Sequence, residues 1–157
     1  FFDPELNQSY VPYVVETSVG LDRMFLSVLS AAYQNEKLED GSERVVLRIP
    51  AVLAPYKAAV LPLVKKDGLP EKAREIMKQL QFDYSIQYDE KDSIGKRYRR
   101  QDAIGTPFSI TIDHQTLTDN MVTVRDRDTM EQIRVSIKEL EVLLAEKASW
   151  KSVLSTL

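Results

Sequence analysis

The stretch from Ser93 to Asp113 constrains the fold most, because a basic helical pattern runs directly into an alternating apolar one. Ser93 is a favourable N-cap residue and Gly105 a favourable left-handed stop, so we predict a helix between them. Apolar and polar residues then alternate over the segment 108–112, FSITI, which is typical of a half-buried strand. A helix joined this closely to a strand holds its charged side chains on a fixed platform.

Positive charge gathers on one side of the predicted helix. Lys96, Arg99 and Arg100 lie three and four residues apart, so they share one helical face. The opposite side carries the apolar residues Ile94, Tyr98 and Ile104. We expect the apolar side to be anchored and the cations to face solvent. The alternative is that these charges are simply solvated, because charge runs are common on surface helices.

The chain around this stretch alternates strand-like and helix-like segments. In order, they are an apolar run at 60–64, an amphipathic helix from about Pro70, a strand at 82–88, the basic helix and a strand at 106–113. This order indicates crossover connections and a parallel core. Two later strands, at 121–125 and 132–135, follow one another closely, so we expect them to be antiparallel.

A last helix is predicted after Ser136 and Glu139, which have the spacing of a capping box and precede an apolar stripe. This helix would close the domain against the sheet. Together, the segments predict an α/β fold in which helices flank a mixed sheet of about five strands.

The first part of the chain is organised differently. A short strand is predicted at 13–17, and Gly20 follows it at the start of an amphipathic helix. The segment 35–44, NEKLEDGSER, is polar, charged and contains glycine, which is typical of an exposed linker. We therefore place a domain boundary there and divide the chain into residues 1–43 and 44–157.

Composition excludes several kinds of chemistry. The chain has no cysteine and one histidine, so it cannot form disulfides, thiolate nucleophiles or histidine metal clusters, and we predict no metal site. His114 lies in a polar turn, where we expect an ordinary surface role. The formal net charge of −3 argues against a protein that coats nucleic acid indiscriminately, although it allows a local basic site.

The sequence also lacks the marks of a membrane or secreted protein. No apolar run approaches the length of a membrane span, and the start does not have the pattern of a secretory signal. We therefore expect a cytoplasmic protein with no membrane partner. Because the sequence begins at Phe1 and not at Met, we also expect a truncated or processed product.

Two separated parts of the chain carry a resemblance to one family. The segments LAPYKAAVLPLVKKDGLPEKAREI, SIGKRYRRQDAIGTPFSITID and MVTVRDRDTMEQIRV resemble the anticodon-binding domain of class II aminoacyl-tRNA synthetases, particularly the homodimeric type of glycyl-tRNA synthetase. Upstream, PYVVETSVGLDRMFL resembles motif 3 of the class II catalytic domain in the same enzymes. The two parts occur in the family's order and together cover nearly the whole chain. The resemblance implies a catalytic remnant followed by an anticodon-binding domain.

The resemblance assigns roles to residues near the start of the first predicted helix. Glu16 and Ser18 match positions that read the glycine substrate, although the general class II motif often has glycine at the second of them. The matching ATP-binding positions are Gly20, Leu21, Asp22 and Arg23. The resemblance thus implies ATP with Mg²⁺ as the cofactor of the parent enzyme, and we expect none bound to this fragment. From the residues alone, a surface ion pair of Arg23 with Asp22 or Glu16 is the alternative.

By the same resemblance, the second domain is expected to bind the anticodon stem-loop of tRNA(Gly). Bases in such a loop are unstacked, so a protein can read their edges while cations hold the backbone. The residues expected to contact the RNA are Lys96, Arg97, Arg99, Arg100, Gln101, Arg125 and Arg127. Two structural alternatives stay open: Arg97 and Gln101 could brace the sheet, and the segment 125–128 could be a self-neutralising turn.

The parent enzyme implied by the resemblance is a glycine–tRNA ligase, a homodimer that uses ATP to attach glycine to tRNA. Motifs 1 and 2 of the family are missing from the sequence, so we predict that this fragment alone is inactive. An alternative is a non-catalytic nucleic-acid-binding accessory factor with the same fold, like the accessory subunit of the mitochondrial DNA polymerase. Glu16, Gly20 and Arg23 argue against it, because such a factor has no need of an intact motif 3.

A third alternative is a nucleotide- or metabolite-binding module that uses the carboxyl ends of its parallel strands. The glycine at position 95 follows Ser93 and Ile94 and precedes Lys96, and this spacing is not that of a phosphate-binding P-loop. We therefore rank RNA binding above this alternative.

Overall fold

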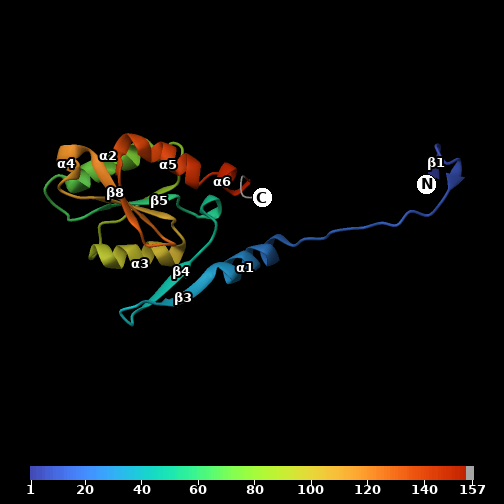
Figure 1. Cartoon of the computed structure of the whole chain (residues 1–157), viewed down its shortest axis with the longest axis horizontal. Coiled ribbons are helices and arrows are strands. Elements are labelled where there is room, and N and C mark those ends of the chain that lie inside the picture. The colour runs from blue at the N-terminus through green and yellow to red at the C-terminus, as the bar shows by residue number, and fades with distance from the viewer. Residues whose placement is uncertain (155–157) are drawn as a thin grey trace.

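The structure is a computed structural model that describes residues 1–154. Its main element is a mixed sheet of five strands, in the order β6-β5-β7-β8-β9 within those residues (Figure 1). The strands are β5 (Ala58–Pro62), β6 (Ile86–Tyr88), β7 (Phe108–Ile112), β8 (Met121–Asp126) and β9 (Gln132–Ser136). Strand β5 is parallel to β6 and β7, whereas β8 is antiparallel to both β7 and β9. The predicted mixed sheet with a parallel core is confirmed.

Helices cover both faces of this sheet. Helices α2 (Leu69–Leu80) and α5 (Leu140–Lys147) lie on one face, and α3 (Ile94–Ile104) lies on the other (Figure 1). The shorter elements are the 3-10 helices η1 (Ala51–Leu53) and η2 (Ile137–Glu139) and the helices α4 (Thr116–Asp119) and α6 (Trp150–Leu154). Within residues 1–154, no helix combines the length and apolar character that a membrane span requires.

The apolar core lies between the sheet and helices α2 and α5. The stripe predicted for α2 is confirmed, because Ala73, Ile76 and Leu80 are buried against the sheet. Leu140 and Leu144 of α5 are buried in the same cluster. Each large aliphatic side chain buried in this way contributes roughly 1.5–3 kcal/mol, so this face supplies most of the apolar stabilisation.

Helix α3 packs on the sheet largely through polar side chains, which agrees with the alternative that Arg97 and Gln101 brace the sheet; the burial of Asp102 was not predicted. Arg97, Gln101 and Asp102 are buried, whereas Ile104, which we expected on the anchored side, is 38% exposed. All five residues of β7 are buried, and Thr111 accepts or donates a 2.7 Å hydrogen bond with the hydroxyl of Tyr98. The prediction of a half-buried strand is therefore wrong: β7 is a central strand covered on both faces.

The helix ends follow the sequence closely. Ser136 and Glu139 form the predicted capping box at η2, which leads into α5. Gly105 ends α3 in the left-handed conformation, with φ of +84°. Ser93 is the N-cap residue of α3 as predicted, although its side chain makes no capping hydrogen bond. Its extended backbone alone turns the chain into the helix.

The residues ahead of the hairpin form an arm and a helix. Two short paired strands, β1 (Phe2–Asp3) and β2 (Gln8–Ser9), lie far from the sheet, and residues 10–20 run as an arm from them to the next helix (Figure 1). The strand predicted at 13–17 is wrong, because residues 10–20 contain none. A strand needs a neighbour to pair its backbone groups, and none lies beside this segment in residues 1–154. Helix α1 (Leu21–Ala32) begins after Gly20 as predicted.

The predicted linker at 35–44 is instead a β-hairpin. Strands β3 (Tyr33–Lys37) and β4 (Glu43–Leu47) pair antiparallel, and α3 packs against β4. The polar composition suggested an exposed connection, but Arg44 and Val46 alternate as buried residues along β4. The predicted boundary between residues 43 and 44 falls inside this strand. The hairpin therefore ties α1 directly to the sheet domain.

Candidate nucleic-acid interface

The seven residues predicted to contact RNA do not share one surface. Three of them, Lys96, Arg99 and Arg100, lie on the outer side of α3, where the first is exposed and the other two are half-buried. The other four are buried side chains with internal partners, namely Arg97, Gln101, Arg125 and Arg127. The structure thus separates the accessible cations from those that belong to the interior.

Arg97 lies beneath the loops that follow β5 and β6. It is 2% exposed, and its guanidinium donates hydrogen bonds to the carbonyl oxygens of Pro62 (2.6 Å), Leu63 (3.1 Å) and Asp89 (3.3 Å). Gln101 is also buried, and its side-chain oxygen accepts a 2.8 Å hydrogen bond from the hydroxyl of Thr106. For both residues the bracing alternative fits the structure, and direct contact with RNA does not.

Arg125 and Arg127 are likewise used inside the protein. Arg125 makes a two-pronged ion pair with Asp102, at 2.8 and 3.1 Å, and its guanidinium lies over the ring of Tyr98 at 4.9 Å. Arg127 donates to the carbonyl oxygens of Gly105 and Ile49 and pairs with Asp128. The self-neutralising turn is thus correct for residues 127 and 128, whereas Arg125 finds its carboxylate on α3. Burial removes both arginines from the surface that RNA can reach.

Arg44 completes this buried network, although no pattern in the sequence pointed to it. Its guanidinium pairs with Glu36 in β3 and with Asp102 in α3, and it donates a 2.9 Å hydrogen bond to the carbonyl oxygen of Arg127. The Glu36 carboxylate also pairs with Arg48. Burial alone raises the pKa of Glu36, but these two arginines more than offset it, so the pKa lies below the ordinary value. The hairpin, α3 and the β8–β9 turn are therefore held together by charge.

Arg100 is accessible but not free. Its guanidinium pairs with Asp89 at 2.7 Å and with Asp92 at 2.9 Å, and it donates to the carbonyl oxygen of Lys91. All three acceptors lie in the loop between β6 and α3. The hydrogen bonds that Arg100 donates to these two aspartates raise its pKa above the ordinary value. Its charge is largely matched by these carboxylates, which leaves Lys96 as the more available cation of the outer face.

Further cations that we did not predict gather near Lys96. The parallel strands β5, β6 and β7 end at the same edge of the sheet, which we call the carboxyl edge. The loop after β5 carries Lys65 and Lys66, the loop after β6 carries Lys91, and all three side chains are exposed. Lys96 lies in the first turn of α3 at this same edge. For Lys65 and Lys66 the signal was present in the sequence, since they directly follow the apolar run of a predicted parallel strand.

The loop after β7 closes this edge on the other side. His114 lies 3.0 Å from the carboxylate of Asp67, so the loops that follow β7 and β5 are in contact. Asp113 accepts hydrogen bonds from the backbone N–H and the hydroxyl of Thr116 and pairs with Arg134 at 2.7 Å. The carboxyl edge is therefore an ordered surface with exposed lysines at its rim.

The Asp113 contacts predict a dependence of stability on pH. Burial raises the pKa of Asp113. The hydrogen bonds from Thr116 and the ion pair with Arg134 lower the pKa by more than burial raises it, so the folded pKa lies below the ordinary value. A depressed folded pKa stabilises the fold above the unfolded pKa, and this contribution is lost as pH falls through the folded pKa. We expect Asp113→Asn to reduce the difference in unfolding free energy between about pH 7 and about pH 3.

Urea titrations of both proteins across this pH range measure the effect. Asp83→Asn, which changes an exposed carboxylate in the turn between α2 and β6, is the matched control and should leave the difference unchanged. An acid dependence that is the same in the Asp113→Asn protein and the wild type would contradict the assignment.

The motif 3 residues lie apart from this edge. Glu16, Ser18, Leu21 and Arg23 are exposed, and the backbone N–H of Met24 donates to the carbonyl oxygen of Gly20 at the start of α1. An apolar groove of about 320 Å³ lies along α1, and Leu21 is the one motif 3 residue among the described residues that line it. It is lined by Leu21, Met24, Phe25, Val28, Leu29, Leu47, Ile49, Leu53 and Pro55. The predicted glycine and ATP positions thus form no enclosed site with the described residues.

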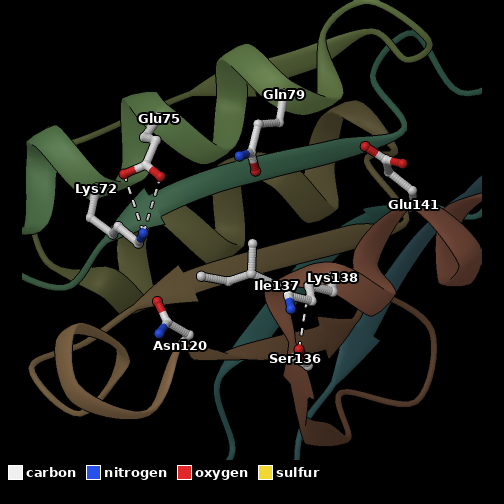
Figure 2. Close-up of a pocket in the computed structure, with 8 residues that line it drawn as sticks. All are labelled: Lys72, Glu75, Gln79, Asn120, Ser136, Ile137, Lys138 and Glu141. Carbon is white, nitrogen blue, oxygen red and sulfur yellow. Dashed lines mark hydrogen bonds and ion pairs between the residues drawn. The ribbon is translucent and has the colours of Figure 1, made fainter.

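A second hollow, of about 590 Å³, lies between α2 and the β9–α5 connection (Figure 2). Lys72 and Glu75 pair on the α2 side at 3.2 Å, and Lys138 and Glu141 face them from the other side. The two cations and two anions balance, so this hollow does not share the positive character of the lysine rim, the name we give to Lys65, Lys66, Lys91 and Lys96 at the carboxyl edge. None of the predicted site residues lies among those described as lining it.

Comparison with known proteins identifies the class of domain. Residues 57–147 match the anticodon binding domain family, so the chain belongs to that family. The fold agrees with a solved structure, the RNA binding domain of threonyl-tRNA synthetase from Cryptosporidium parvum, with a TM-score of 0.58 over 64% of this chain and 26% of that one. At 22% sequence identity, this likeness concerns the fold alone.

Curated relatives are more similar in sequence. The chain is 54% identical over 147 residues to the glycine–tRNA ligase of Clostridium acetobutylicum, a match that covers 94% of this chain and 31% of the relative. It is also 54% identical over 151 residues to the glycine–tRNA ligase of Staphylococcus haemolyticus, covering 96% of this chain and 32% of that relative. The chain therefore spans about a third of the length of these relatives.

Proposed function

We propose that this chain is the anticodon-recognition part of a glycine–tRNA ligase and binds the anticodon stem-loop of tRNA(Gly). The observation that carries the proposal is the sheet domain itself: a member of the anticodon binding domain family with exposed lysines along one ordered edge. Relatives with about half of their residues identical are named glycine–tRNA ligases, which supports the choice of RNA.

The RNA would lie across the carboxyl edge. Lys65, Lys66, Lys91 and Lys96 would hold backbone phosphates, and Arg99 on the outer face of α3 would extend this surface. Unstacked bases of the loop would then face the backbone groups and side chains at the ends of β5, β6 and β7. Because Arg100 is paired with two aspartates, we assign it to ordering the loop and not to a phosphate.

Replacing Lys65 and Lys66 together by alanine is expected to weaken RNA binding about tenfold. Without these two phosphate contacts, binding also releases fewer counterions from the RNA. The slope of log affinity against log salt concentration should therefore become shallower by about 1.5. Fluorescence anisotropy of a labelled tRNA(Gly) anticodon stem-loop, repeated over a range of salt concentrations, measures both quantities.

The matched control is a variant with two alanines at Lys78 and Lys147, which lie in the last turns of α2 and α5. Both helices run back from the carboxyl edge, so these lysines lie at the opposite end of the domain. The control should bind like the wild type. Equal losses in the two variants would indicate non-specific attraction, and no loss in either would refute the proposed surface.

The parent enzyme is proposed to be a homodimeric, cytoplasmic class II synthetase that uses ATP and Mg²⁺ to attach glycine. Support comes from the motif 3 resemblance, in which Gly20, Leu21, Asp22 and Arg23 would bind ATP and Glu16 and Ser18 would bind glycine. Arg23 lies in the first turn of α1, where the helix N-terminus also favours an anion. When bound, ATP would supply the adenylyl group that activates the carboxyl group of glycine, with pyrophosphate as the leaving group.

The fragment alone is proposed to lack ligase activity. The motif 3 residues are exposed in the described structure and are not enclosed by a pocket that could hold glycine and ATP together. ATP–pyrophosphate exchange in the presence of glycine, measured on the 157-residue chain, tests this. Turnover above background would contradict it.

A further inference from the structure

Arg97 occupies an unusual place for a charged residue. It projects from α3 into the space below the carboxyl edge, where it is 2% exposed and contacts three backbone carbonyl oxygens. Two of these carbonyls, from Pro62 and Leu63, lie at the end of β5. The third belongs to Asp89, directly after β6. One guanidinium therefore joins the two strand ends from which the lysine-bearing loops depart.

The loops joined in this way carry the cations of the proposed RNA surface. Lys65 and Lys66 follow Leu63 by two and three residues, and Lys91 follows Asp89 by two. Loops on a protein surface are mobile unless their backbone is held, and flexible cations lose conformational entropy when they bind a phosphate. The hydrogen bonds of Arg97 hold the backbone at the base of both loops; we call this contact the brace. It reduces the entropy loss because it fixes the backbone position from which each lysine side chain extends.

The chemistry of this contact suits arginine and no other side chain. The planar guanidinium presents several N–H donors in a fixed arrangement, so it can reach three acceptors on two strands at once. A lysine ammonium at the same place is a single point that cannot span them. Arg100 strengthens the same arrangement from outside, since it holds Asp89, Asp92 and the carbonyl oxygen of Lys91.

We infer that Arg97 is a positioning residue for RNA binding: it ties the ends of β5 and β6 together and so sets the spacing of Lys65, Lys66 and Lys91. It acts through these lysines and does not touch RNA itself. This inference rests on the proposed function, because it deals with how the lysine rim is held. It predicts that losing Arg97 weakens binding without removing any phosphate contact.

Arg97→Met, which keeps much of the side-chain volume but has no donors, is the direct test. In the anisotropy assay with the tRNA(Gly) anticodon stem-loop, its affinity should fall about fivefold to tenfold while the salt slope stays that of the wild type. Amide hydrogen exchange should become faster in residues 63–68 and 89–92. Arg97→Lys keeps the charge but cannot bond all three carbonyl oxygens. Its loss of affinity should be nearly as large as that of Arg97→Met.

The variant with alanines at Lys65 and Lys66 separates this inference from the proposed function. One outcome is that the lysine variant binds more weakly and has a shallower salt slope while both Arg97 variants bind like the wild type. The proposed RNA surface is then supported, and the positioning role of Arg97 is wrong. If neither the lysine variant nor the Arg97 variants change binding, the proposed RNA surface itself is wrong, and the brace falls with it.

Two other results would overturn the brace alone. A salt slope that becomes shallower by about 0.7 or more in Arg97→Met would indicate a direct phosphate contact. Circular dichroism should show all variants folded at the assay temperature. If neither Arg97 variant folds, the residue is a determinant of folding and not of loop spacing.

Discussion

Asp102→Ala is expected to lower the free energy of unfolding by about 3–5 kcal/mol, the largest loss of any single substitution we predict. The Asp102 carboxylate is fully buried and accepts hydrogen bonds from Arg44 at 3.2 Å and from Arg125 at 2.8 and 3.1 Å. Removing it leaves the buried guanidinium of Arg125 without its carboxylate partner and takes from Arg44 one of its two carboxylates, the other being Glu36. An unpaired buried charge costs far more than the pair contributes, so the effect should exceed that of an ordinary surface ion pair.

Chemical denaturation of the 157-residue chain, followed by circular dichroism, measures this loss. A domain of this size is typically stable by about 5–15 kcal/mol, so the variant should be close to unfolding but still measurable at low temperature. Asp128→Asn is the matched control, because Asp128 also pairs with two arginines but has an exposed side chain. Its cost should stay below about 1 kcal/mol. Similar losses for both variants would show that burial of the network contributes little.

The fold of the sheet domain could be predicted because its signals are local. Strand β5 is a continuous apolar run, α2 has a helical stripe after Pro70, and Gly105 marks the end of α3. The order of these elements then fixes the parallel core, since a crossover helix between two strands makes them parallel. None of these inferences depended on knowing what each element would meet.

The hairpin could not be predicted, and the choice between a solvated and a bracing role for the polar side chains of α3 could not be made, for the opposite reason. The segment 35–44 has the composition of a linker, and it becomes a hairpin because Arg44 meets Asp102, a residue 58 positions away. The buried side of α3 is polar because its partners are backbone carbonyls and a carboxylate network. A helical wheel assigns such residues to solvent, since it contains no information about partners across the fold.

The same limit explains the candidate site. Arg97, Arg125 and Lys96 are equally charged in sequence, and only their partners distinguish interior from surface. Lys65 and Lys66 could have been found, because lysines after a predicted parallel strand lie at the edge where α/β proteins bind ligands. Helical periodicity drew attention to α3 and away from the loops that share its N-terminal end.

Gly105→Ala is expected to cost about 2–3 kcal/mol of stability, through backbone strain and a collision together. Gly105 has φ of +84°, where a side chain adds about 1–2 kcal/mol of strain. An added Cβ would also lie 3.1 Å from the backbone oxygen of Leu47 and 3.0 Å from the Cδ1 of Ile49. The Ile49 side chain can shift, but Leu47 is held in the hairpin by its pairing with Tyr33.

Gly95→Ala is the matched control and should have the opposite sign. Gly95 belongs to the same helix, has an ordinary helical φ and has no atom within 4 Å of an added Cβ in the described structure. Alanine is the better helix former, so this substitution should stabilise the protein by about 0.4–1 kcal/mol. Thermal unfolding of the two variants beside the wild type gives both values. The left-handed backbone at the end of α3 and its contact with the hairpin then account for the difference between the two variants. If Gly105→Ala were as stable as Gly95→Ala, the hairpin would not approach this helix end as closely as the structure shows.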